Sequence, residues 1–185
     1  IATDGAGGAI ITWNDYGRGE SGGSAAVYAQ RVLASGLVAP GWTPDGVAIT
    51  TDEPINGNPS LVSDGASGAI IAYLHGANHE VRARRLLSNG VLDPTWPSDG
   101  SLLCAASGLR GSIELESDDA SGAIVVWQDQ RGGVNTDDVY AQRVLSSGAL
   151  AGGWPADGRA LCTAAGVQRG PFEVVLTGKI VGFFG

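Results

Sequence analysis

The sequence repeats itself, and this constrains the fold more than any other feature of the chain. The segment Val-Tyr-Ala-Gln-Arg-Val-Leu at 27–33 returns as Val-Arg-Ala-Arg-Arg-Leu-Leu at 81–87 and again unchanged at 139–145. A repeat of about 55 residues indicates stacked supersecondary units that share a continuous core. We therefore predict one domain, 1–185, made of the following units: repeat 1 (1–57), repeat 2 (58–111), repeat 3 (112–169) and a partial repeat 4 (170–185).

Each full repeat contains four short apolar or alternating runs, separated by clusters of Gly, Asn, Asp and Pro, and this pattern predicts β-strands. In repeat 2 the runs are 59–63, 68–74, 80–87 and 101–105. The second run is apolar on both faces, so both of its faces must be covered. Four-stranded antiparallel sheets stacked around an axis supply that cover. We predict an all-β fold, a β-propeller-like array of four-stranded blades; a β-sandwich and a solenoid are the alternatives.

Three full repeats are fewer than the roughly four to eight blades of closed propellers. An open stack exposes sheet faces and edges that favour association. A homo-oligomer would close the ring, and in a twofold dimer the segment 171–176 would add a strand to the partner's first blade, giving about six blades. The alternatives are a piece of a longer protein and a C-terminal tail that arose by cloning or a frame change.

Four motifs give the sequence a resemblance to a known family. They are Asp-Gly-Ala-Gly-Gly-Ala-Ile at 4–10, Trp-Gln-Asp-Gln-Arg-Gly-Gly at 127–133, Asp-Val-Tyr-Ala-Gln-Arg-Val at 138–144 and Leu-Cys-Thr-Ala-Ala-Gly at 161–166. The chain resembles the β-propeller-type repeats of bacterial secreted and surface proteins, a family of unassigned function. The resemblance implies a scaffold that is secreted or on the cell surface, and it implies no particular reaction. Repeat 2 departs from the pattern, with Tyr-Leu-His at 73–75 in place of Trp-x-Asp.

The composition limits the partners. A net charge of -8 argues against a nucleic-acid or anionic-membrane surface, because those surfaces need clustered Lys and Arg. The sequence has no apolar stretch long enough for membrane insertion, and the missing signal peptide and initiating Met favour a mature or trimmed chain. The two histidines and two cysteines share no ligand spacing, so we expect no metal site. Cys104 and Cys162 occupy equivalent strand positions, where we expect small apolar residues and no disulfide.

Arg31, Arg85 and Arg143 recur in the middle of an apolar strand, where each needs an acceptor. We predict a structural ion pair within each blade, with Asp15 and Asp129 as partners in repeats 1 and 3; a ligand-binding Arg/Asp pair is the alternative. The aromatic residues that end the second run or precede the last one are expected to anchor the core or the contact between blades, with a ring of sugar-binding platforms as the alternative. These residues are Trp13, Tyr73 and Trp127, and Trp42, Trp96 and Trp154.

Length differences between the repeats concentrate in one loop, which is where repeat proteins often place binding residues. The loops 14–24 and 128–138 contain the candidate ligand-binding residues Asp15, Tyr16, Arg18, Asp129, Arg131 and Asn135. Aromatic faces beside planar polar side chains suit carbohydrate recognition. We therefore predict a non-catalytic binding or display module for glycans or a protein partner. Calcium is a weaker alternative cofactor, because the regular Asp-x-Asp-x-Asp-Gly loop is absent from the sequence.

A glycosidase-like hydrolase and a purely structural fragment are the alternative functions. Carboxylates are numerous enough to nominate an acid/base pair. The nominated residues are Asp15, Glu20, Asp52, Glu53, Glu114 and Glu116. No Gly-x-Ser-x-Gly, His-Glu-x-x-His or phosphate-loop motif occurs in the sequence, so we assign no catalytic residue.

Overall fold

The computed structural model describes residues 1–18, 25–51, 59–133 and 136–168, and this part of the chain is all-β, with strands and no helix. The strands form three four-stranded antiparallel sheets. Sheet 1 contains β1 (Ala2–Thr3), β2 (Ala9–Asp15), β3 (Ala26–Val32) and β4 (Val47–Thr50). Sheet 2 contains β5 (Ser60–Ser63), β6 (Ala69–His75), β7 (Glu80–Leu86) and β8 (Ser101–Cys104). Sheet 3 contains β9 (Arg110–Ser117), β10 (Ala123–Asp129), β11 (Asp138–Val144) and β12 (Arg159–Cys162).

Each sheet is a meander in which strands adjacent in sequence are hydrogen-bonded neighbours. The prediction of an all-β fold with four strands per repeat is confirmed, and in repeat 2 every strand end lies within one residue of its predicted position. β9 starts at Arg110, so the predicted boundary between repeats 2 and 3 falls inside this strand. The partial repeat 4 at 170–185 lies outside the described residues.

The tight turn between the first two strands of each sheet depends on an aspartate. In sheet 2, Asp64 Oδ1 accepts hydrogen bonds from the backbone N–H groups of Ala66 and Gly68, each at 2.8 Å. A Cβ at Gly68 would lie 2.4 Å from the Leu86 carbonyl oxygen, so the position requires glycine. Asp4 and Asp118 make the equivalent bonds in sheets 1 and 3. This explains why an Asp-x-x-x-Gly turn opens each repeat.

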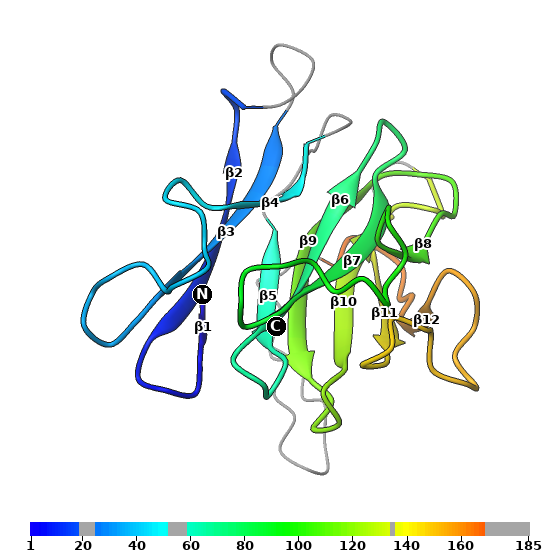
Figure 1. The fold of residues 1–185 in the computed structure, drawn as a ribbon. Coiled ribbons are helices and arrows are strands. Elements are labelled where there is room, and N and C mark those ends of the chain that lie inside the picture. The colour runs from blue at the N-terminus through cyan, green and yellow to red at the C-terminus, as the bar shows by residue number, and fades with distance from the viewer. Residues whose placement is uncertain (19–24, 52–58, 134–135, 169–185) are drawn as a thin grey trace.

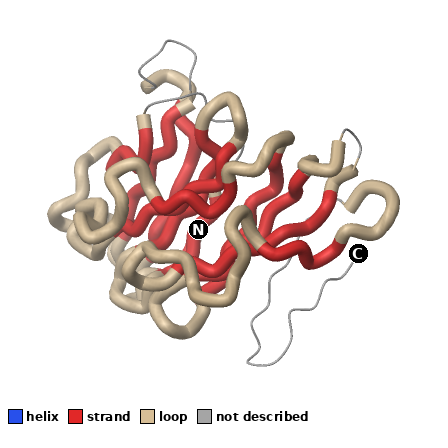
Figure 2. Tube along the Cα trace, turned by 90° about the vertical axis from the view of Figure 1, so that its right-hand side faces the viewer, coloured by secondary structure: helices blue, strands red, loops and turns tan. Residues whose placement is uncertain are grey.

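The three sheets pack face to face, with sheet 2 between the other two (Figures 1 and 2). One core cluster joins Ile10 and Ile49 of sheet 1 to Ile71 of sheet 2. A second joins Ile70 of sheet 2 to Val125 of sheet 3. Side chains on both faces of β6 are therefore fully buried, as its apolar sequence predicted. The structure shows three stacked sheets, and a closed propeller stays a prediction.

The predicted partners of the repeated arginines were wrong. Each arginine pairs with the turn aspartate: Arg31 with Asp4 at 3.0 Å, Arg85 with Asp64 at 2.8 Å, and Arg143 with Asp118 at 2.8 Å.

The strand register explains the error. Arg31 lies opposite Ile10, near the start of β2, whereas Asp15 lies opposite Ala26 at the far end of the same strand. The arginine is therefore beside the turn that precedes β2. Each ion pair joins the third strand of a sheet to the turn between its first two strands, which is a structural role.

Candidate functional site

The candidate loop of sheet 1 is organised around Arg18. Its Nε donates to Asp15 Oδ2 at 2.7 Å, and its Nη1 donates to the Asp45 carbonyl oxygen at 2.8 Å. The guanidinium carbon lies 3.7 Å from the centroid of the Tyr28 ring, in cation–π contact. Tyr28 in turn stacks on Trp13, with ring centroids 6.2 Å apart. Trp13, Tyr28 and Arg18 thus form three layers on one face of sheet 1, at the loop end of its two central strands β2 and β3; we call this stack the aromatic edge.

The Asp15 carboxylate is held in its ionised form. Its Oδ1 accepts from the Gly17 N–H at 2.9 Å and from the Arg18 N–H at 3.1 Å. The bond from Gly17 and the side chain of Arg18 together keep the pKa of Asp15 below its usual value. The neighbouring Tyr16 is 67% exposed. The loop therefore presents one exposed phenol beside a neutralised ion pair.

Sheet 3 repeats this arrangement with Asp129 and Arg131. Arg131 Nε donates to Asp129 Oδ1 at 2.9 Å, and its Nη2 donates to Asp129 Oδ2 at 2.6 Å. The guanidinium carbon lies 3.7 Å from the centroid of the Tyr140 ring, and Nη2 also donates to the Asp157 carbonyl oxygen at 2.7 Å. Asp129 is fully buried, unlike Asp15. The sequence named these four residues as binding candidates without pairing them, and the structure pairs Asp15 with Arg18 and Asp129 with Arg131.

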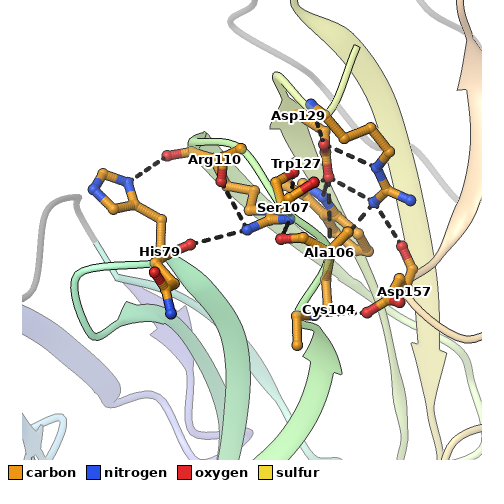
Figure 3. A network of polar contacts seen from close by, with 12 residues as sticks. His79, Cys104, Ala106, Ser107, Arg110, Trp127, Asp129 and Asp157 are labelled. Atoms are coloured by element: carbon orange, nitrogen blue, oxygen red, sulfur yellow. Dashed lines mark hydrogen bonds and ion pairs between the residues drawn. The ribbon is translucent and has the colours of Figure 1, made fainter. Parts of the chain in front are cut away.

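The acceptor atoms of Asp129 are fully engaged (Figure 3). In addition to Arg131, Oδ2 accepts from Trp127 Nε1 at 2.9 Å and from Arg110 Nε at 3.4 Å. Burial by itself would raise the pKa of Asp129, but the hydrogen bonds from Arg131 and Trp127 outweigh burial and hold it below the usual value. Asp129 is consequently an ionised structural anchor.

The buried Arg110 joins this network to sheet 2. Its Nη1 donates to the carbonyl oxygens of Asn78 and Gly108, each at 2.9 Å, and its Nη2 donates to the Ala106 carbonyl oxygen. Asn78 lies in the turn between β6 and β7, so the guanidinium bridges sheets 2 and 3. Arg110 could not be singled out from the sequence, because no other repeat has an arginine at the start of its first strand.

Repeat 2 also has an arginine that binds both a carboxylate and the backbone carbonyl of the Asp-Gly turn, but from a different position in the sequence. Arg82 occupies the position of Tyr28 and Tyr140, and its Nη1 donates to the Asp99 carbonyl oxygen at 3.0 Å. Glu80 supplies its carboxylate partner at 2.8 Å. In each sheet an arginine therefore binds the backbone carbonyl of the Asp-Gly turn before the last strand. A sequence signal for this arrangement exists: Arg82 replaces the tyrosine of the other repeats in repeat 2, where the loop between the second and third strands is shortest.

The structure does not unite the two candidate loops in one site. Sheet 2 lies between sheets 1 and 3, and each Asp/Arg pair belongs to its own sheet. Among the nominated acids, Glu114 accepts a hydrogen bond from Ser60 Oγ at 3.3 Å. Three others and one candidate binding residue lie outside the described residues: Glu20, Asp52, Glu53 and Asn135.

Comparison with protein-family models, curated proteins and solved structures found no significant match. Within the described residues, no group of three or more His, Cys, Asp and Glu side chains is placed to hold a metal ion. The described part of the chain also contains no helix that is long and apolar enough to cross a membrane. Both cysteines are free; Cys104 is buried, and burial raises the pKa of its thiol.

Proposed function

We propose that the chain is a non-catalytic binding and display module of the β-propeller type, which binds a glycan at the loop of sheet 1. The observation that supports this most directly is the exposed Tyr16, two residues before Arg18, whose guanidinium is fixed on the aromatic edge. A sugar presents an apolar face and a rim of hydroxyl groups. An exposed phenol ring suits the first, and a fixed guanidinium with a carboxylate suits the second.

The pairing of the carboxylates favours binding over hydrolysis. A glycosidase needs a general acid whose pKa is raised toward neutrality. Asp15 and Asp129 have the opposite property, because hydrogen bonds and arginine partners lower the pKa of each carboxyl group. They are also placed in different sheets with sheet 2 between them. We therefore assign them structural and contact roles and no part in proton transfer.

We also propose that the protein is secreted or on the cell surface, because its repeats resemble those of bacterial secreted and surface proteins. Calcium is not required for the proposed contact, because Arg18 already neutralises Asp15 at 2.7 Å. We expect glycan binding to persist after treatment with a chelator.

The test is a glycan array with the full chain, followed by titration of the best ligand. Tyr16→Ala should weaken binding by about tenfold or more, because an exposed aromatic contributes to contact and not to the core. Leu109→Ala is the matched control, since Leu109 is an exposed apolar residue of the segment before β9. The absence of glycan binding by the wild-type chain, or equal affinities for both variants, would contradict the proposal. Protein binding that is lost in Tyr16→Ala would replace the glycan with a protein partner.

A further inference from the structure

One contact between sheets occurs twice among the described residues. Trp42 of sheet 1 donates from Nε1 to the Ser88 carbonyl oxygen of sheet 2 at 3.0 Å, and Trp96 of sheet 2 donates to the Ser146 carbonyl oxygen of sheet 3 at 3.0 Å. Both carbonyls belong to the tight turn that follows the third strand of a sheet, which we call the third-strand turn (33–37, 87–91 and 145–149). Each tryptophan thus fastens its own sheet to the next one.

The same turn receives two further interactions. The arginine that pairs with the turn aspartate of the preceding sheet donates to the same carbonyl oxygen: Arg31 Nη1 to Ser88 at 3.2 Å, and Arg85 Nη1 to Ser146 at 3.4 Å. The indole also lies against a turn glycine. A Cβ at Gly90 would lie 3.1 Å from Trp42 Cγ, and a Cβ at Gly148 would lie 2.9 Å from Trp96 Cδ2. The contact therefore combines two hydrogen bonds with close packing.

Sheet 3 presents the donor half of this contact at its outer face. Trp154 is only half-buried, and its indole N–H has no acceptor among the described residues, unlike Trp42 and Trp96. The side chain of Arg143 is 34% exposed, against 13% for Arg31 and 17% for Arg85.

The centre of the outer face of sheet 3 is buried, and exposure is limited to its margin, which includes the last strand; the buried residues are Val126, Val139 and Ala141. Leu161 is 37% exposed, whereas its counterparts Ile49 and Leu103 are 0% and 1% exposed. A further sheet would cover these residues just as sheets 2 and 3 cover the outer faces of sheets 1 and 2.

Sheet 1 presents the acceptor half. Its third-strand turn has the same hydrogen bond as the other two, with Gly36 N–H donating to the Leu33 carbonyl oxygen at 2.9 Å. Residues 34–36 are exposed, and a Cβ at Gly36 would meet nothing within 4 Å. On the outer face of this sheet Ile11 and Trp13 are partly exposed, whereas their counterparts in sheets 2 and 3 are fully buried.

We propose that a second copy of this chain completes the contact between sheets at both ends of the array. Trp154 and Arg143 of one copy bind the carbonyl oxygen of Ala34 in the other copy, and the indole packs on Gly36 of that copy. A twofold axis generates this junction twice, because each copy carries one donor half and one acceptor half. Two copies of three sheets make a ring of six, within the range of closed propellers.

Two observations favour a second copy as the occupant. The missing junction continues a contact that the chain already makes twice, with the same residue types on both sides. Residues 169–185 lack the Val-x-Ala-x-Arg segment that precedes every third-strand turn, so they do not supply the acceptor turn.

Binding of a second copy is also compatible with the proposed glycan site. Arg131 is the counterpart of Arg18 in sheet 3, and its side chain is 21% exposed although sheet 2 covers that face of sheet 3.

Sedimentation equilibrium of the full chain over a dilution series tests the proposal. The wild-type chain should form a dimer, and Trp154→Ala and Gly36→Ala should each weaken the dimer by about tenfold or more. Gly5→Ala is the matched control, because Gly5 has a similar φ of +73° and equally open surroundings. Gly5→Ala should dimerise like the wild type. Urea unfolding of each variant at low concentration reports whether the monomer has kept its fold.

A mixture of the two damaged variants distinguishes this junction from other dimers. The mixed dimer contains one wild-type junction, formed by Trp154 of the Gly36→Ala copy and Gly36 of the Trp154→Ala copy. The other junction carries both substitutions, which cost less than their sum because the Cβ added at residue 36 no longer meets an indole. The mixture should therefore associate more tightly than either variant alone. The proposal is overturned by a wild-type monomer at every concentration, by species larger than a dimer, by dimerisation that neither substitution weakens, or by a mixture no tighter than its components. Loss of glycan binding by Tyr16→Ala with an unchanged dimer would leave the two proposals independent.

Discussion

Gly148→Ala offers the sharpest measure of the contact between sheets. Gly148 has a φ of +83°, and a Cβ there would lie 2.9 Å from Trp96 Cδ2 and 3.0 Å from Ser101 Oγ. The left-handed backbone costs alanine about 1–2 kcal/mol, and the overpacking adds about 1–3 kcal/mol. Displacement of the indole also weakens its bond to the Ser146 carbonyl, which contributes about 1 kcal/mol. The expected loss in the free energy of unfolding is about 3–6 kcal/mol.

Gly36→Ala is the matched reference for this loss. Its φ is +81°, but the new Cβ would meet nothing within 4 Å, so the monomer should lose only about 1–2 kcal/mol from the backbone. Urea unfolding followed by tryptophan fluorescence, at concentrations where the chain is monomeric, measures both values. A difference of about 2–4 kcal/mol is the contribution of the packed indole contact. Equal losses for the two variants would refute the role that we assign to Trp96.

Three further predictions concern the ion pairs and the thiols. Asp64→Ala should lower the free energy of unfolding by about 3–5 kcal/mol, because it leaves the largely buried Arg85 with only the more distant Asp93 carboxylate at 3.6 Å and removes the acceptor of two turn N–H groups; a loss below about 1 kcal/mol in urea titrations would contradict the structural role of this ion pair. Asp118 and Asp129 have folded-state pKa values below their unfolded value of about 3.9, so their contribution is present above that pH and is lost as the pH falls through the lower folded values. Melting temperatures should therefore drop as the pH is lowered below about 4, and a constant or rising melting temperature there would be inconsistent with these pairs. A thiol reagent should modify Cys162 faster than the fully buried Cys104 and should slow at Cys162 when the chain dimerises, whereas equal rates would argue against the burial difference.

The strands could be predicted from the sequence because their signals are local. The run at 69–73 is apolar on both faces, and the Asp-x-x-x-Gly turn before it sets where β6 begins. The burial of Trp42 and Trp96 followed from their aromatic character and their repeated position. The two outer faces of the described array could be anticipated from the count of repeats, because three stacked sheets have two outer faces.

The partners of the charged residues could not be predicted from spacing alone. Arg31 was assigned to Asp15, but the register of β2 and β3 carries it to Asp4 at the opposite end of the strand. Arg18 and Arg82 bind backbone carbonyl oxygens. Every residue type has such an oxygen, so these partners cannot be recognised in the sequence. Side-chain pattern predicts sheets well, whereas ion pairs depend on register and on turns remote in sequence.

The same limit applies to the acceptor half of the proposed junction. The Ala34 carbonyl is a main-chain group, and its equivalence to the Ser88 carbonyl is visible only once the turns are superposed through their shared hydrogen bond. The donor half could be recognised more readily, because Trp154 belongs to a series of three tryptophans. Sequence therefore indicates which side chains recur, and the structure identifies what each of them contacts.

The most direct test of the account is the absolute mass of the wild-type chain in solution, measured by light scattering after size exclusion across a range of loading concentrations. The account predicts a discrete species with twice the mass of the 18.7 kDa chain, in which the contact made by Trp42 and Trp96 is made again by Trp154. A chain that stays at 18.7 kDa at every concentration would contradict the claim that the donor half on sheet 3 and the acceptor half on sheet 1 are complementary.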